Sequence, residues 1–200
     1  KESSAASDVY KRQEKTSIFV EKMADFFRYN VKKGEEDATL EEELEAVDNY
    51  IYILNVRFAG DIHFSKKVEC DVENVRVPSM ILQPVVENAV NHGIRNIDWE
   101  GHIDLSVEKW NDHIEISVRD NGLGMTGEQI QRVLSKKVHS SSGVGDSTGI
   151  GMNNVISRLE LYYERDGLME IYSEGEGMGT EVVINIPLER SEKNVQNPDC

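Results

Sequence analysis

The spacing of the apolar residues changes at Gly60, and this change constrains the fold more than any other feature of the 200-residue chain. Before Gly60, apolar residues recur every three or four positions, which is the period of an amphipathic helix. After Gly60, short stretches alternate between apolar and polar residues, as in strands that bury one face. The sequence therefore predicts a helical segment followed by a separate unit that combines strands and helices.

The helical segment, residues 16–59, is predicted to be a hairpin of two helices, and residues 1–15 a disordered or foreign lead-in without periodicity. The first helix carries large apolar side chains at helical spacing: Phe19, Met23, Phe26 and Phe27. The second begins at Thr39, where Thr39 to Glu42 is typical of a capping box. Its apolar stripe consists of Leu40, Leu44, Val47, Ile51, Leu54 and Phe58. This stripe is too apolar for a solvent-facing surface, so we expect it to pack against a helix of this chain or of a second one.

The second unit, residues 60–190, is predicted to be an α+β fold: a two-layer α/β sandwich, with a mixed sheet and helices on one face. The expected strands are 62–68, 103–107, 114–118, 168–173 and 181–186. The expected helices run from about Ser79 to His92 and from Gly151 to Glu164. The Ser/Gly-rich stretch 126–148 is predicted to be a poorly ordered lid with a short helix at its start, and residues 191–200 a flexible tail.

Composition excludes several classes of partner. The chain has 37 acidic and 22 basic residues, a formal net charge of -15. This charge repels nucleic-acid phosphates and anionic lipid, so we expect no nucleic-acid partner. An anionic nucleotide could still bind locally, through a metal ion and backbone N–H groups. The two cysteines, Cys70 and Cys200, have no metal-binding spacing and fit a reducing cytoplasm, and no apolar run is long enough to cross a membrane.

Three short segments carry candidate chemistry, and the first is Gln83 to Gly93. On a regular helix, Glu87, Asn88 and Asn91 would project to one side. Their carboxylate and amide oxygens suit Mg²⁺, which keeps several waters and shares its remaining sites with phosphates. Taken alone, the polar outer face of a helix that ends at Gly93 explains these residues equally well.

The second segment, Asp120 to Met125, directly follows a predicted strand. An Asp at a strand end can accept a hydrogen bond from an adenine amino group, and Gly122 and Gly124 would let the backbone pass close to a flat ring. Alone, an ordinary Asn-Gly turn is the simpler interpretation. The third segment, Thr148 to Met152, places two glycines at the start of a helix, where exposed N–H groups attract phosphate. Its spacing matches neither a dinucleotide fingerprint nor a P-loop.

Together, these segments resemble the N, G1, lid and G2 boxes of the GHKL ATPases, which share the Bergerat fold and include gyrase B, MutL, heat-shock chaperones and histidine kinases. The match is close to the LytS/YesM-like sensor histidine kinases. That subgroup's signatures are similar to Ile81–Ala89 with His92-Gly93, and to Gly149–Met152 followed by Asn154-Val155 and Arg158-Leu159. The resemblance spans roughly residues 18–188.

The resemblance implies an ATP-binding catalytic domain that uses ATP and Mg²⁺, with Asn88 as the metal ligand and Glu87 as the group that orients or deprotonates the attacking histidine. The implied nucleotide-binding residues are Asn88, Asn91, His92, Asp120, Gly122, Gly124, Gly149, Gly151 and Thr180. Asp120 and Thr180 would hold adenine, Gly122 and Gly124 would admit the base, and Gly149 and Gly151 would meet the phosphates. Asn91 occupies a position where relatives commonly have lysine, and His92 fits a phosphate contact or a packed, capping histidine equally well.

One departure from the family pattern concerns the phosphate acceptor. None of the five histidines lies in the subgroup's His-Phe-Leu-like acceptor box: His63, His92, His102, His113 and His139. We therefore expect the acceptor upstream of this fragment, which should bind ATP without phosphorylating itself. The resemblance further implies a homodimeric sensor of the bacterial inner membrane, with this part in the cytoplasm, and a response regulator as partner.

Two other functions remain open at this point. A GHKL-type ATP hydrolase is disfavoured because Pro84 stands where hydrolysing relatives place a catalytic Glu, four positions before the metal-binding Asn. A non-catalytic dimerisation module is disfavoured by the retained Asp120 and the glycines.

Overall fold

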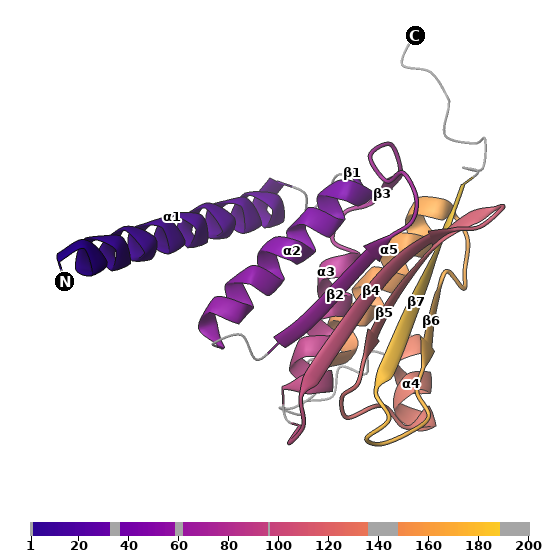
Figure 1. Cartoon of the computed structure of the whole chain (residues 1–200). Helices are drawn as coiled ribbons and strands as arrows, with labels where there is room; N and C mark the ends of the chain where they lie inside the picture. Colours follow the sequence, from indigo (N-terminus) through magenta and orange to yellow (C-terminus); the bar gives the residue numbers. More distant parts are fainter. Residues whose placement is uncertain (1, 33–36, 59–61, 96, 136–147, 189–200) are drawn as a thin grey trace, which may run out of the picture.

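The computed structural model describes residues 2–32, 37–58, 62–95, 97–135 and 148–188. Figure 1 shows a long N-terminal helical arm beside a twisted sheet that carries further helices on one face. The helices are α1 (Glu2–Lys32), α2 (Leu40–Arg57), α3 (Leu82–Asn88), the π-helix η1 (Ala89–Ile94), α4 (Gly127–Leu134) and α5 (Thr148–Tyr163). The strands are β1 (Asp37–Thr39), β2 (Ile62–Val68), β3 (Arg76–Pro78), β4 (Gly101–Lys109), β5 (His113–Asp120), β6 (Met169–Tyr172) and β7 (Thr180–Pro187).

The helices α1 and α2 lie against one another, as expected for a hairpin (Figure 1). Phe26 of α1 stacks on Tyr50 of α2, with ring centroids 6.0 Å apart. Thr39 caps α2 through a capping box with Glu42, as its sequence predicts. The interpretation of residues 1–15 as an unstructured lead-in is wrong for residues 2–15, which belong to α1. Polar residues without an apolar stripe can continue a helix that is already nucleated, because each added residue then costs little.

The main sheet has five strands in the order β2-β4-β5-β7-β6. The pair β2–β4 is parallel and the other three pairs are antiparallel, so the sheet is mixed, as predicted. A second sheet pairs β1 with β3, and the sequence patterns did not reveal it. Both of its strands have only three residues, too few for an alternating pattern to be recognised.

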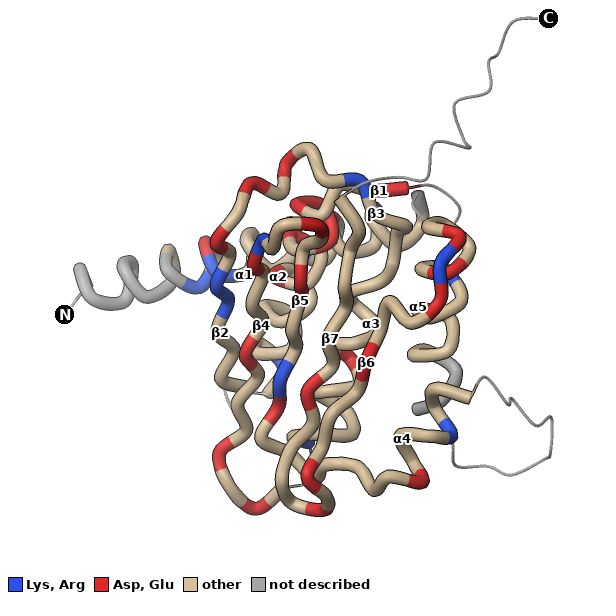
Figure 2. Tube along the Cα trace, turned by 90° about the vertical axis from the view of Figure 1, so that its right-hand side faces the viewer, with Lys and Arg blue, Asp and Glu red and all other residues tan. Residues whose placement is uncertain are grey.

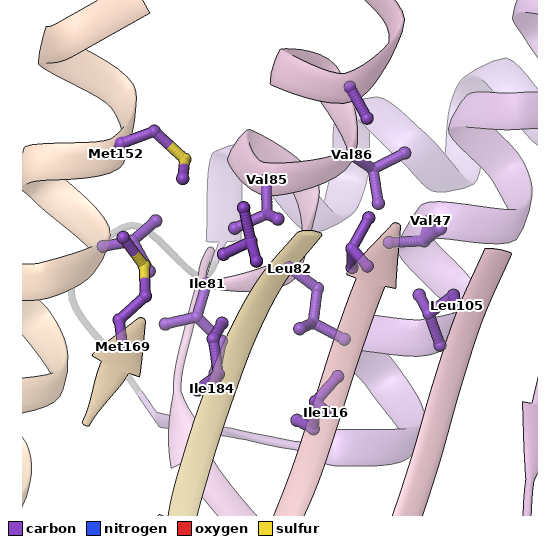
Figure 3. Packing of buried hydrophobic residues seen from close by; sticks show 14 of the residues in the cluster. Val47, Ile81, Leu82, Val85, Val86, Leu105, Ile116, Met152, Met169 and Ile184 are labelled. Atoms are coloured by element: carbon purple, nitrogen blue, oxygen red, sulfur yellow. The ribbon is translucent and has the colours of Figure 1, made fainter. Parts of the chain in front are cut away.

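The hydrophobic core lies between the sheet and the helices α2, α3 and α5. Figure 3 shows Leu105 of β4 and Ile116 of β5 on the inner face of the sheet, below Val47 and Leu82 from the helices, while Met152 comes from α5. The opposite face of the sheet is polar, and Figure 2 shows acidic residues spread along its strands. This one-sided burial explains the period-two alternation seen in the sequence. No helix in the described part of the chain is both long and apolar enough to cross a membrane.

The predicted helix from Ser79 to His92 is shorter and less regular than expected. It begins only at Leu82, because Pro78 still pairs in β3 and Met80 adopts a positive φ of 63°. After Asn88 the helix widens into η1, where the N–H of Arg95 donates to the carbonyl of Val90, five residues earlier. Such π-helical turns inside α-helices are rare and frequent at functional sites.

Candidate functional site

Three segments meet at the end of the sheet where β5 stops and β7 begins. Asp120, the last residue of β5, pairs with Thr180, the first of β7. The end of η1 lies against this pair, since a Cβ on Gly93 would come within 2.7 Å of the Asp120 carboxylate. In the first turn of α3, Pro84 lies near α5, since a Cβ on Gly151 would lie 3.8 Å from the Cβ of Pro84. The fold therefore brings the candidate segments of the sequence to one region.

Asp120 is a buried carboxylate, 5% exposed. Its Oδ1 accepts a hydrogen bond from the N–H of Gly122 at 2.9 Å, and the N–H of Thr180 also donates to the carboxylate. Burial raises the pKa of Asp120 to about 6, although the two N–H groups act in the opposite direction. A carboxylate has about four acceptor positions, so Asp120 retains capacity to bind an amino group of a ligand.

The raised pKa of Asp120 predicts that its ionised form destabilises the empty protein. The destabilisation is absent below the ordinary pKa of 3.8 and fully present above about 6. We therefore expect Asp120→Asn to increase the free energy of unfolding at pH 7.5 by roughly 1–3 kcal/mol, with a smaller gain at pH 5. Urea unfolding at both pH values tests this, with the exposed Asp166→Asn as control. A loss of stability at pH 7.5 would refute it.

The glycines after Asp120 allow three backbone segments to pack closely. A Cβ on Gly122 would lie 2.0 Å from the carbonyl oxygen of Gly93, and the N–H of Leu123 donates to that same oxygen at 3.0 Å. Gly124 has a φ of 70°, and a Cβ there would lie 2.1 Å from the carbonyl oxygen of Gly175. We predicted that these glycines make room for a flat ring, but protein backbone occupies the directions in which their side chains would point.

Glu87 is half-buried on α3, on the side that faces the hairpin. Its Oε1 accepts a hydrogen bond from Nε2 of Gln83 at 2.8 Å, one helical turn earlier. Burial, followed by the negative charge of Glu87, raises the pKa of Tyr50 on α2 to about 12. The carboxylate therefore has a fixed orientation and lies near the helix against which α1 packs.

Asn88 is 7% exposed, and its Oδ1 has no hydrogen-bond partner among the described residues. An unsatisfied buried oxygen costs about 1–3 kcal/mol, which a bound cation would relieve. In the described part of the chain, three other buried side-chain oxygens also have no hydrogen-bond partner, on Asn49, Gln83 and Asn153. The described residues contain no group of three His, Cys, Asp or Glu side chains that could hold a metal ion by themselves. Asn88 therefore fits a Mg²⁺ ion that takes most of its ligands from water and phosphate.

Comparisons with known proteins identify the family of this chain. The profile of the family described as histidine kinase-, DNA gyrase B-, and HSP90-like ATPase matches residues 76–190, and a histidine kinase profile matches residues 3–62. The chain belongs to this ATPase family. Within it, the chain is an ATP-binding catalytic domain of the sensor histidine kinase type.

The relatives of this ATPase domain include sensor proteins of several bacteria. The sensor protein LytS of Staphylococcus saprophyticus is 28% identical over 94% of this chain and 31% of its own length. The sensor histidine kinase YpdA of Escherichia coli is 30% identical over 83% of this chain and 27% of its own length. The sensor protein kinase HptS of Staphylococcus aureus is 27% identical over 88% of this chain and 33% of its own. The chain thus spans about a third of the length of these relatives.

Solved structures show the same fold. The mycobacterial sensor histidine kinase MprB superimposes with a TM-score of 0.53 at 18% identity, over 76% of this chain and 96% of that one. The catalytic domain of the histidine kinase ThkA gives a TM-score of 0.51 at 21% identity, over 76% of this chain and 93% of that one. The predicted two-layer sandwich of the GHKL ATPases is confirmed.

The other predicted site residues of the ATPase domain lie on η1 and α5, and the predicted lid begins with α4. Asn91 and His92 are exposed on η1, so they do not share the buried environment of Asn88. The expectation that Asn88 and Asn91 project to one side assumed a regular helix, whereas Asn91 lies in the wider turn of η1. Gly149 and Gly151 lie in the first turn of α5, and the side-chain surroundings of Gly149 are outside the described residues. Thr126 caps α4 at the start of the predicted lid, whose residues 136–147 are also outside them.

Sequence reasoning missed the loop between β6 and β7. The hydroxyl of Ser173 accepts from the N–H of Met125 at 3.0 Å and donates to the carbonyl of Gly179 at 2.6 Å. The N–H of Gly177 donates to the carbonyl of Leu123 at 2.7 Å. These bonds hold the segment after Asp120 in place. The close spacing of Gly175, Gly177 and Gly179, all with positive φ, is the signal that could have identified this loop.

Proposed function

We propose that this domain transfers the γ-phosphoryl group of ATP to a histidine of its parent sensor kinase, outside the five histidines of this chain. The observation that carries the proposal is the juxtaposition of a buried carboxylate, Asp120, with a helix that presents Asn88 and Glu87. Asp120 suits an adenine amino group, and the buried Oδ1 of Asn88 suits a cation bound to phosphates.

Each residue has a role that follows from its environment. Asp120 and Thr180 hold the adenine, and Gly122 and Gly124 shape the adenine side of the site. Mg²⁺, when bound, neutralises the charge that develops on the phosphates, and Asn88 would be its ligand from this chain. Positive potential at the start of α5, where Gly149 and Gly151 lie, attracts the phosphate oxygens.

Glu87 is the group that orients the attacking histidine or removes its proton. Its side chain lies near Tyr50 of α2, and thus on the side of the helical hairpin from which an acceptor would approach. The hydrogen bond from Gln83 keeps the carboxylate in one orientation. Catalysis of phosphoryl transfer depends mainly on such positioning and on charge neutralisation.

Hydrolysis of ATP is the less favoured alternative. Water would need a base to activate it, and Pro84 stands one turn before Asn88 with no ionisable group. Pro84 instead packs near Gly151 of α5. A slow turnover of ATP is therefore expected.

We further infer a homodimeric parent, a sensor protein of the bacterial inner membrane with this domain in the cytoplasm, and a response regulator as the phosphoryl acceptor in the next step. The support is the relatives' names as sensor kinases and the apolar surface of α1. Its Val20, Phe27 and Val31 are 59%, 56% and 82% exposed, which a second chain could cover.

Incubation with γ-labelled ATP and Mg²⁺ tests the proposed transfer. We expect no acid-labile label on this chain alone, and near-stoichiometric label on a longer version of the protein that includes the upstream acceptor box. The same longer version with Asp120→Asn should be labelled at least tenfold more slowly, because the substituted amide presents a different donor and acceptor pattern to adenine. Stoichiometric acid-labile phosphate on this chain alone would contradict the proposal.

A further inference from the structure

Glu43 is a carboxylate buried in the interior of the molecule, 1% exposed, in the first turn of α2. It accepts hydrogen bonds from the backbone N–H groups of Ile81 at 2.9 Å and Leu82 at 2.8 Å, and from that of Met80. The hydroxyl of Tyr29, on α1, donates to the same carboxylate. Four donors from two other segments of the chain therefore converge on one side chain.

These bonds supply an N-terminal cap that α3 does not have of its own. The first N–H groups of a helix lack partners within the helix, and the N-cap residue Ile81 makes no side-chain capping bond. Glu43 takes over this function from a helix 38 residues earlier in the sequence. Because the carboxylate is ionised, the hydrogen bonds that it accepts are stronger than those between neutral groups. The positive end of the helix dipole also favours a negative charge at this position.

The same turn is held from its other side by α5. The guanidinium of Arg158 donates from Nη1 to the carbonyl oxygen of Ser79 at 2.6 Å. Residues 79–82 therefore form a junction between the hairpin, through Tyr29 and Glu43, and α5, whose first turn carries Gly149 and Gly151.

The junction is close to the candidate Mg²⁺ ligand. Asn88 follows Leu82 by six residues, which corresponds to about 9 Å along a helix. A helix this short has no independent stability. A displacement of the first turn of α3 is therefore expected to displace Asn88, at the other end of the same helix.

A requirement for folding alone would not explain Glu43. Burying a carboxylate is costly, and well-packed apolar residues commonly replace buried charges without loss of stability. Burial indeed raises the pKa of Glu43, against the effect of its four donors. The neighbouring acids Glu41 and Glu45 of α2 are exposed to solvent.

We propose that Glu43 is a positioning residue, which holds the first turn of α3 and thereby places Asn88 for Mg²⁺-dependent nucleotide binding, with Tyr29 linking α1 to the same carboxylate. This inference rests on the proposed function of Asn88. It makes the position of the hairpin and the geometry of the nucleotide site depend on each other.

The test is calorimetric ADP binding at a temperature well below unfolding, with excess Mg²⁺ and with a chelator. In Glu43→Gln, we expect the gain in affinity that Mg²⁺ provides to fall by roughly five- to tenfold. The affinity without Mg²⁺ should change by less than about twofold, because Asp120 lies on β5 and its partners are intact. Glu45→Gln changes an exposed neighbour on the same helix and is the matched control. It should bind ADP like the chain without substitutions, with and without Mg²⁺.

The outcomes separate the two proposals. A Glu43→Gln chain that is less stable but keeps the full Mg²⁺-dependent gain has lost only a structural contact, which overturns the inference. If the chain without substitutions binds ADP no more tightly with Mg²⁺ than with the chelator, the proposed role of Asn88 is wrong, and this inference is wrong with it.

If Glu43→Gln does not fold, Tyr29→Phe carries the test, because it keeps Glu43 and its three backbone partners. Faster hydrogen exchange at residues 80–88, together with a smaller Mg²⁺-dependent gain, is the expected result. Unchanged exchange and unchanged gain would overturn the link from α1.

Discussion

Replacing Asn88 with alanine should slow phosphoryl transfer from MgATP by roughly 10²–10³-fold in a longer version of the kinase that contains the acceptor histidine. Asn88 is a buried residue of α3 whose Oδ1 has no hydrogen-bond partner among the described residues. Its loss removes a ligand that positions the metal against the transferring phosphoryl group. Initial rates of label incorporation at saturating MgATP measure this effect, and ADP binding by the present chain should lose its dependence on Mg²⁺.

Two companion variants make this prediction specific. Asn91→Ala alters an amide three positions further along, on the exposed side of η1, and should reduce the rate by less than about threefold. Glu87→Gln should slow transfer while leaving ADP affinity nearly unchanged, because Glu87 acts on the acceptor and not on the nucleotide. Equal losses in Asn88→Ala and Asn91→Ala would show that Asn88 has no special role as a ligand.

Replacing Gly122 with alanine should be among the most destabilising single changes in the domain. The new Cβ would lie 2.0 Å from the carbonyl oxygen, 2.1 Å from the carbonyl carbon and 2.5 Å from the Cα of Gly93. These are backbone atoms at the end of η1, so neither partner can move aside by changing a rotamer. We expect a loss of about 3 kcal/mol in the free energy of unfolding and a fall in melting temperature of roughly 6–12 °C.

The same substitution should also weaken ADP binding at least tenfold, because Gly93 is packed against the Asp120 carboxylate. Gly127→Ala is the matched control: nothing lies within 4 Å of the Cβ position at Gly127, at the first residue of α4. Alanine is a better helix former than glycine, so Gly127→Ala should leave stability unchanged or slightly higher. Thermal unfolding and calorimetry of both variants decide the point, and a Gly122→Ala chain as stable as Gly127→Ala would refute the close packing.

The order of helices and strands was predictable because local patterns encode it. Alternation over 103–107, 114–118 and 181–186 identified strands that bury one face of a sheet, and the capping box at Thr39 marked the start of α2. The candidate segments around Asn88, Asp120 and Gly151 were also visible, because each is a short run of residue types with distinctive chemistry. Their combination, in this order, identified the ATPase family before any contact was known.

The sequence was less informative where stability comes from distant partners. Polar residues 2–15 carry no apolar stripe, yet they continue α1. The strands β1 and β3 are too short for a periodic signal, and they exist because each pairs with the other, with Ala38 opposite Val77, 39 positions later in the sequence. The widening of the helix at Ala89 to Ile94 likewise has no local signal in the residue types.

The sequence by itself thus determined the succession of elements, the side of each strand that is buried and the identities of the candidate site residues. Only the tertiary structure decided what those residues touch. It showed that Gly122 and Gly124 pack against backbone, and that Glu43, among several similar acids of α2, is the one that caps α3. The physical reason is that periodicity and capping act between neighbours along the chain. The environment of a buried carboxylate or a glycine depends instead on segments that meet only after the chain has folded.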